Sequence, residues 1–150
     1  MTSNVAALAI GAFVVLLAGT GSPSAQQGQL PWQTSWSVFI EALGPLPGPE
    51  SMRAYRQFEG RVVTWEGVVG PSTDGTFALE MTPSAALGYD VSLQVTPREV
   101  TRWTSLAVGS HVRFKGSVAA VFPVRVTRAG GTTTTTAVFV KDADLIDASN

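Results

Sequence analysis

The sequence predicts a mainly β protein, a small five-stranded barrel with one helix between the third and the fourth strand. From Arg61 onward, apolar and polar residues alternate with a period of two, which is typical of half-buried strands. Residues 96–109 interrupt this alternation with a helix-like pattern. Gly67 and Gly116 stand inside the expected first and fourth strands, where a barrel strand has to bend.

Length and composition allow one domain and exclude several function classes. The chain has 150 residues, of which 45% are hydrophobic and 14% charged, enough apolar material for one core. Its net charge of -1 gives no basic excess that would point to a polyanion. Because it has no Cys and one His, disulfides, thiol nucleophiles and Cys-based or multi-histidine zinc sites are excluded. We therefore expect no cofactor and no metal.

The N-terminal segment predicts export. Residues 5–18 are apolar or small without interruption, which is short for a membrane-spanning helix and typical of the core of a signal peptide. We expect a cleavable signal peptide over residues 1–25 and a periplasmic or extracellular protein with no membrane span after cleavage. The alternative is a protein anchored in the membrane by an uncleaved N-terminal segment.

Residues 26–50 are expected to form a flexible preface to the barrel domain, which is assigned to residues 51–147. Three Pro and two Gly between positions 44 and 49 exclude regular structure there. Trp32 and Trp36 are expected to dock onto the barrel, because a folded chain tends to bury Trp. Trp65 and Trp103 are expected in the core.

The elements of the domain follow from the local patterns. A short helix over residues 51–58 carries Met52, Tyr55 and Phe58 on one face. Strands are expected over residues 61–69, 76–81, 91–95, 111–118 and from 137 onward. Asp74-Gly75 supplies the positive φ of the first hairpin. Residues 122–136, with Gly130-Gly131 and five consecutive Thr, are expected to be a loose loop.

The best local signal is the start of the helix between the third and the fourth strand. Thr96 suits the N-cap, Pro97 suits the first helical position, and Glu99 can close a capping box. The helix is then expected to run through Val100, Trp103 and Leu106 and to end at Gly109.

This order of five strands and one helix is that of an OB-fold, a Greek-key barrel. Three segments also carry a family resemblance: residues 55–69 with Phe58-Glu59-Gly60, residues 106–116 with Gly109 and Gly116, and residues 138–146. On these residues the chain resembles the tRNA-anticodon-binding-like OB domains and is similar to small bacterial periplasmic OB-fold proteins. The resemblance covers roughly residues 53–147 and implies the fold but little chemistry.

OB-folds bind ligands across the second and third strands. The alternation places Thr76, Ala78 and Glu80 outward on the second strand and Ser92 and Gln94 outward on the third. None of these is aromatic or basic, so the face lacks what a single-stranded nucleic acid needs, and that partner is disfavoured. With the loops over residues 71–75 and 122–136, the face suits a glycan or a protein partner. We therefore predict a binding module whose ligand contacts are Thr76, Glu80, Ser92 and Gln94.

A basic stripe gives an alternative anion-binding site. His111, Arg113 and Lys115 alternate on the outer face of the fourth strand, and Arg125 and Arg128 lie in the expected loop after it. Such a stripe can hold a nucleic acid or another polyanion. It can equally be a charged strand face that keeps a sheet soluble.

The sequence contains no complete catalytic or metal-binding pattern. Ser110 and His111 are neighbours in a strand and therefore point to opposite faces. The aspartates at the end of the chain lack the glycine and the closing glutamate of a calcium loop. These aspartates are Asp142, Asp144 and Asp147.

A hydrolase that uses a pair of carboxylates is the remaining alternative. Glu66 and Glu80 lie on the outer faces of the first and second strands, where they can approach each other as an acid and a base. No nucleophile elbow or phosphate-binding loop accompanies them. We therefore expect a binding module rather than an enzyme.

Overall fold

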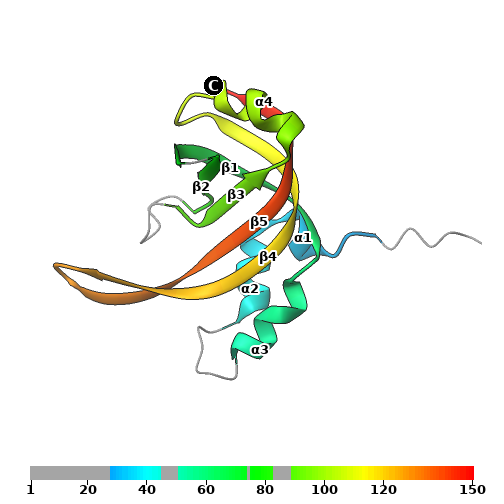
Figure 1. The fold of residues 1–150 in the computed structure, drawn as a ribbon. Coiled ribbons are helices and arrows are strands. Elements are labelled where there is room, and N and C mark those ends of the chain that lie inside the picture. The colour runs from blue at the N-terminus through cyan, green and yellow to red at the C-terminus, as the bar shows by residue number, and fades with distance from the viewer. Residues whose placement is uncertain (1–27, 45–50, 74, 83–88) are drawn as a thin grey trace, which may run out of the picture.

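The computed structural model describes residues 28–44, 51–73, 75–82 and 89–150. These residues form a closed barrel with the strand order β1-β2-β3-β5-β4 (Figure 1). The strands are β1 (Val62–Thr73), β2 (Thr76–Glu80), β3 (Val91–Val95), β4 (His111–Arg128) and β5 (Gly131–Ser149). Neighbouring strands are antiparallel except for β3 and β5, which are parallel. The predicted OB-fold architecture is thus confirmed. The predicted signal peptide, the Pro-rich part of the preface and Asp74 lie outside the described residues.

Short helices cover the two ends of the barrel. Near one end lie α1 (Pro31–Thr34), α2 (Trp36–Leu43) and α3 (Ser51–Tyr55), which continues as a 3₁₀ turn over Arg56–Phe58. At the other end lies α4 (Val100–Thr104), between β3 and β4 (Figure 1). No helix in the described ranges is long and apolar enough to cross a membrane.

The described part of the preface is helical and packed rather than flexible. Phe39 is fully buried and Trp36 nearly so, and Trp32 packs against them. The Phe39 ring lies 4.8 Å from the Trp65 ring, and the Trp65 indole N–H donates to the carbonyl of Trp32 at 3.1 Å. The docking of both preface tryptophans is confirmed. Residues 28–44, expected as part of a flexible preface, contain two short helices in the structure, because tertiary packing stabilises helices too short to persist alone. The boundary between preface and barrel domain stays a prediction.

The barrel interior is filled by the inward residues of the alternating strands. Trp65, Leu79, Leu93 and Phe114 are buried, and Trp103 closes one end against Phe77 and Phe114. The core positions expected for Trp65 and Trp103 are therefore confirmed. Two apolar residues of the short helices stay outside the core, since Met52 is 47% exposed and Val100 is 39% exposed. Both residues lie on helices of five residues, which are too short to bury every apolar side chain that they carry.

Gly116 occupies a point of close contact between β4 and β5. A Cβ atom there would lie 2.5 Å from a methyl group of Val140 and 3.2 Å from the carbonyl oxygen of Lys141. The ladder between β4 and β5 is irregular at this point, between Lys115 and Ser117. Glycine therefore permits the approach that closes the barrel.

The predicted capping box is not formed. The Thr96 hydroxyl donates to Asp144 at 2.9 Å, and Glu99 accepts a hydrogen bond from the backbone N–H of Leu145 at 3.0 Å. Residues Pro97–Glu99 form a 3₁₀ turn, and the α-helix after it is only five residues long. Both side chains bind β5 because it lies close to the helix start and offers partners that a local pattern cannot reveal.

β4 and β5 continue past the barrel as a long hairpin (Figure 1). Their pairing runs without a break from Phe122 opposite Ala137 to Arg128 opposite Gly131. The loose loop expected over residues 122–136 is therefore wrong. The Val and Thr residues of this segment are β-branched and favour extended backbone, and Gly131 provides the positive φ of the turn. We call residues 122–137 the arm.

Candidate ligand-binding face

The predicted ligand residues lie next to one another on the outside of β2 and β3. Thr76 pairs with Gln94, and Ala78 pairs with Ser92. Ser92 and Gln94 are exposed, whereas Thr76 and Glu80 are half-buried. Because directly opposite residues point to the same face of a sheet, these hydroxyl and amide groups form one polar row. Their role in binding stays a prediction.

β5 adds an aromatic and a basic residue to this row. Phe139 pairs with Ser92 in the parallel ladder and is half-buried, while the Val residues on either side of it are fully buried. Lys141, two residues further along, is exposed. Phe122, on the neighbouring strand, is 40% exposed. We call the resulting surface the β2–β3–β5 face and include in it Phe122 from the adjoining strand β4; its members are Thr76, Glu80, Ser92, Gln94, Phe122, Phe139 and Lys141.

As predicted, the outward residues of β2 and β3 include no aromatic or basic side chain, but β5 adds Phe139 and Lys141 next to them. The prediction that disfavoured nucleic acid considered β2 and β3 alone. The parallel pairing of β3 with β5 is long-range and leaves no local signal. The alternation of Phe139 and Lys141 with the inward Val138 and Val140 was the available indication that they point outward.

The five predicted anion-binding residues do not form one site. His111, Arg113 and Lys115 are exposed on the barrel part of β4, whereas Arg125 and Arg128 lie on the arm (Figure 1). Two of the barrel cations also have acidic neighbours. Arg113 pairs with Glu66 at 3.8 Å, and Lys115 lies opposite Asp144 in the ladder. The barrel part of the stripe is therefore a surface of mixed charge.

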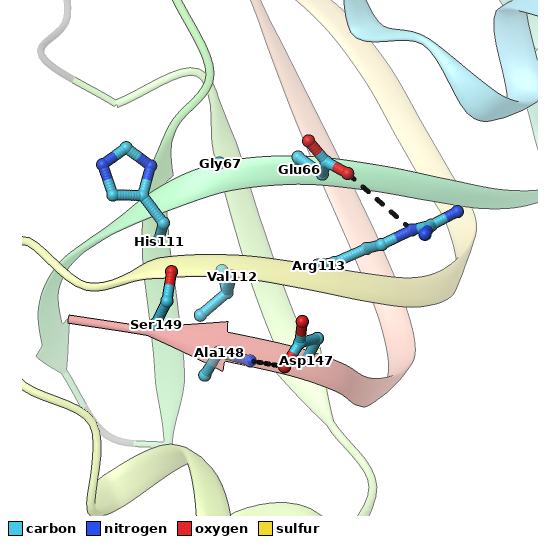
Figure 2. Close-up of a pocket in the computed structure, with 8 residues that line it drawn as sticks. All are labelled: Glu66, Gly67, His111, Val112, Arg113, Asp147, Ala148 and Ser149. Carbon is cyan, nitrogen blue, oxygen red and sulfur yellow. Dashed lines mark hydrogen bonds and ion pairs between the residues drawn. The ribbon is translucent and has the colours of Figure 1, made fainter.

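A hollow of about 260 Å³ opens between β1, β4 and the end of β5 (Figure 2). Glu66, His111 and Arg113 project on the same side of the sheet, and Val112 points to the other side (Figure 2). An adjoining hollow of about 350 Å³ is lined by Glu66, His111 and Glu80 among others. The two carboxylates predicted as an acid–base pair thus border one hollow together with the single histidine. A hydrolytic role for them stays a prediction.

The other candidate polar residues have structural partners. Ser110 is buried and its hydroxyl donates to Asn150 at 2.9 Å, whereas His111 is exposed, so the two point apart as expected. Asp147 accepts a hydrogen bond from the N–H of Ala148. In the described part of the chain, no three metal-ligating side chains come together as a possible metal site.

Asp144 anchors the start of the helical segment to β5. Partial desolvation alone would raise its pKa. The pKa nevertheless lies below its ordinary value, because Thr96 and Arg98 donate hydrogen bonds to the carboxylate and the positive charges of Arg98 and Lys115 are near. Arg98 approaches it to 2.7 Å.

This lowered pKa predicts a small pH dependence of stability. A carboxyl group whose pKa is lower in the folded than in the unfolded state stabilises the fold above the unfolded pKa of about 3.9, and the contribution disappears as pH falls through the folded pKa. We expect Asp144→Asn to reduce stability near neutral pH by less than about 1 kcal/mol, since the pair is largely exposed. Urea unfolding at several pH values gives the free energy of unfolding of the unchanged protein and of Asp144→Asn, and the two values should converge below about pH 4. A difference between them that stays constant into acid would contradict the expectation.

A third depression, of about 250 Å³, lies between α2 and the base of the arm. Trp36, Ile40 and Leu43 line it from the helix, and Thr134, Thr135 and Thr136 line it from β5. It is a groove beside the edge of β5.

No known family model matches the sequence, and no curated protein sequence matches it. Among solved structures, the chain is similar to a mitochondrial single-stranded DNA-binding protein of S. cerevisiae, Rim1. The match has 14% sequence identity and a TM-score of 0.35, and it covers 61% of this chain and 100% of that one. A selenomethionine form of the same protein gives 14% identity, a TM-score of 0.34 and coverages of 61% and 99%. The resemblance is distant, and the fold assignment rests on the strand order itself.

Proposed function

We propose that this protein is a non-catalytic binding module that holds a glycan on the β2–β3–β5 face. The observation that carries the proposal is the position of Phe139 opposite Ser92, on the strand that also carries the exposed Gln94. A sugar ring offers an apolar C–H face and a rim of hydroxyl groups. A half-buried aromatic ring at the surface, next to hydroxyl and amide side chains, complements both. Such sites combine apolar surface with a few well-placed polar groups.

Two further features support a glycan. The apolar run over residues 5–18 predicts export, which would bring the protein among extracytoplasmic polysaccharides rather than nucleic acids. The face also carries Glu80 next to the polar row, and a carboxylate accepts hydrogen bonds from sugar hydroxyls but repels phosphates.

The proposal is tested by calorimetric titration with short neutral oligosaccharides. We expect Gln94→Ala and Phe139→Leu each to weaken binding about tenfold, because one loses hydrogen bonds and the other loses the flat ring but keeps apolar volume. Arg113→Ala, on a different part of the barrel, is the control and should bind like the unchanged protein. Affinity should depend little on salt.

Single-stranded nucleic acid is the second candidate. Phe122 and Phe139 offer stacking surface, and Lys141 lies on the same face. Titration with an oligothymidine distinguishes the two. Binding that weakens steeply with salt and is lost in Lys141→Ala would favour nucleic acid and contradict the glycan.

A further inference from the structure

The arm is an incomplete sheet. The ladder between β1 and β4 ends at Ser117 of β4. The ladder between β3 and β5 begins at Val138 of β5. Between those points and the turn, β4 and β5 pair with each other, and no other strand of the described ranges adds to them. A two-stranded ribbon is marginally stable in water, and a third strand or a packing partner is normally required.

The two edges of the arm differ in their ability to accept another strand. The β4 edge carries Pro123, Arg125 and Arg128, and proline and charge are the features that protect an edge from pairing. The β5 edge consists of residues 132–136, five threonines without charge or proline. Threonine is β-branched and favours strands, so the β5 edge is the one open to pairing.

The backbone of β5 presents hydrogen-bonding groups at this edge. The Val138 N–H donates to the carbonyl of Asp90 at 3.0 Å, on the side away from β4. Because the backbone groups of a strand alternate in direction with a period of two, the N–H groups of Thr136, Thr134 and Thr132 point to the same side. Thr132 and Thr133 are exposed, whereas Thr136 is buried at the base of the arm, where α2 lines the other side of the depression of about 250 Å³.

We propose that the β5 edge of the arm pairs with the β5 edge of a second copy of this chain. The two β5 strands run antiparallel and are related by a two-fold axis near Thr133. A run of identical residues is complementary to itself when reversed, and threonine pairs across strands are favourable. A two-fold contact of this kind closes on itself and stops at a dimer. The result is a four-stranded sheet in the order β4, β5, β5, β4.

Packing and charge agree with this arrangement. Residues that lie opposite each other in antiparallel strands point to the same face of the sheet. Phe122, Val124 and Val126 of both copies therefore lie on one face of the four-stranded sheet. The arm has two arginines and no acidic residue. Both lie on the outer β4 strands, which are three strand spacings or about 14 Å apart. That separation exceeds the screening length of about 8 Å at physiological salt, so the positive charges oppose the contact little.

The test uses the absence of cysteine from the chain. The N–H of Thr133 points toward β4, away from the second copy. Thr133 and the Thr133 of the second copy therefore form a non-hydrogen-bonded pair, in which the two Cα atoms approach more closely than in a hydrogen-bonded pair. Thr133→Cys in the full-length protein should therefore form a disulfide-linked dimer under mild oxidation. Thr127→Cys, equally exposed but on the outer strand, is the matched control and should form no disulfide-linked dimer, although its β5 edge is unchanged. Cross-linking in neither variant, or to the same extent in both, would overturn the proposal.

A second pair of variants tests the edge without cross-linking. Thr134→Pro removes an N–H that points to the edge and leaves the bonds between β4 and β5 in place. Sedimentation velocity should show a dimer for the unchanged full-length protein and for Thr134→Val, and a monomer for Thr134→Pro. A monomeric unchanged protein, a Thr134→Pro variant that still dimerises, or larger open-ended species would each overturn the proposal. Binding only to an added partner peptide would assign the edge to a different protein.

Discussion

Phe39→Ala is expected to destabilise the protein by about 3–5 kcal/mol, although Phe39 lies outside the barrel strands. The Phe39 side chain is fully buried, and its ring lies 4.8 Å from Trp65 and 5.2 Å from Phe58. Truncation leaves a cavity that the surrounding rings of Trp36 and Trp65 cannot collapse to fill. Urea unfolding followed by tryptophan fluorescence measures the loss.

The neighbouring residue provides the control for this prediction. Ile40 lies on the same helix and is 38% exposed, so Ile40→Ala should cost less than about 1 kcal/mol. Equal losses in the two variants would show that α2 does not belong to the barrel core.

Asp90→Ala is expected to cost about 2–3 kcal/mol, because one buried carboxylate satisfies two backbone donors. One Asp90 carboxylate oxygen accepts hydrogen bonds from the N–H of Met81 at 2.9 Å and of Thr82 at 2.8 Å. Its own backbone N–H donates to Leu79, and its carbonyl accepts from Val138. Asp90 therefore ties the end of β2 and the start of β3 to β5, just beside the proposed ligand face.

Asp90→Asn separates the hydrogen bonds from the charge. The amide oxygen can accept both bonds, so the loss should fall to about 1 kcal/mol, the typical value for neutral acceptors. The same denaturation experiment makes the comparison. If Asn costs as much as Ala, the negative charge rather than the two hydrogen bonds stabilises this corner.

The sequence predicted those features that depend on local alternation. Leu79 and Leu93 are inward, Thr76 and Gln94 face outward, and Gly75 has the positive φ that the hairpin requires. These results follow from the two-residue period of a strand, which fixes the face of each side chain once the strand is placed. The outer polar row could be predicted for the same reason.

Where local and long-range partners compete for the same groups, the long-range partners prevail in this protein. Thr96 and Glu99 match a capping box, yet both bind β5, because a nearby strand offers better partners than the helix itself. Gly130-Gly131 and the threonine run suggested a loop, and β4 and β5 instead pair along the whole segment. Glycine there is confined to the turn, and the threonines are strand formers.

By itself, then, the sequence determined the element order, the inward residues and the OB-fold, because these depend on periodicity and on turns. Only the tertiary structure decided that α2 completes the core, that β5 brings Phe139 beside Ser92, and that an arm extends from the barrel. Each of these joins segments far apart in the chain, and such contacts depend on shape and burial that no local pattern contains.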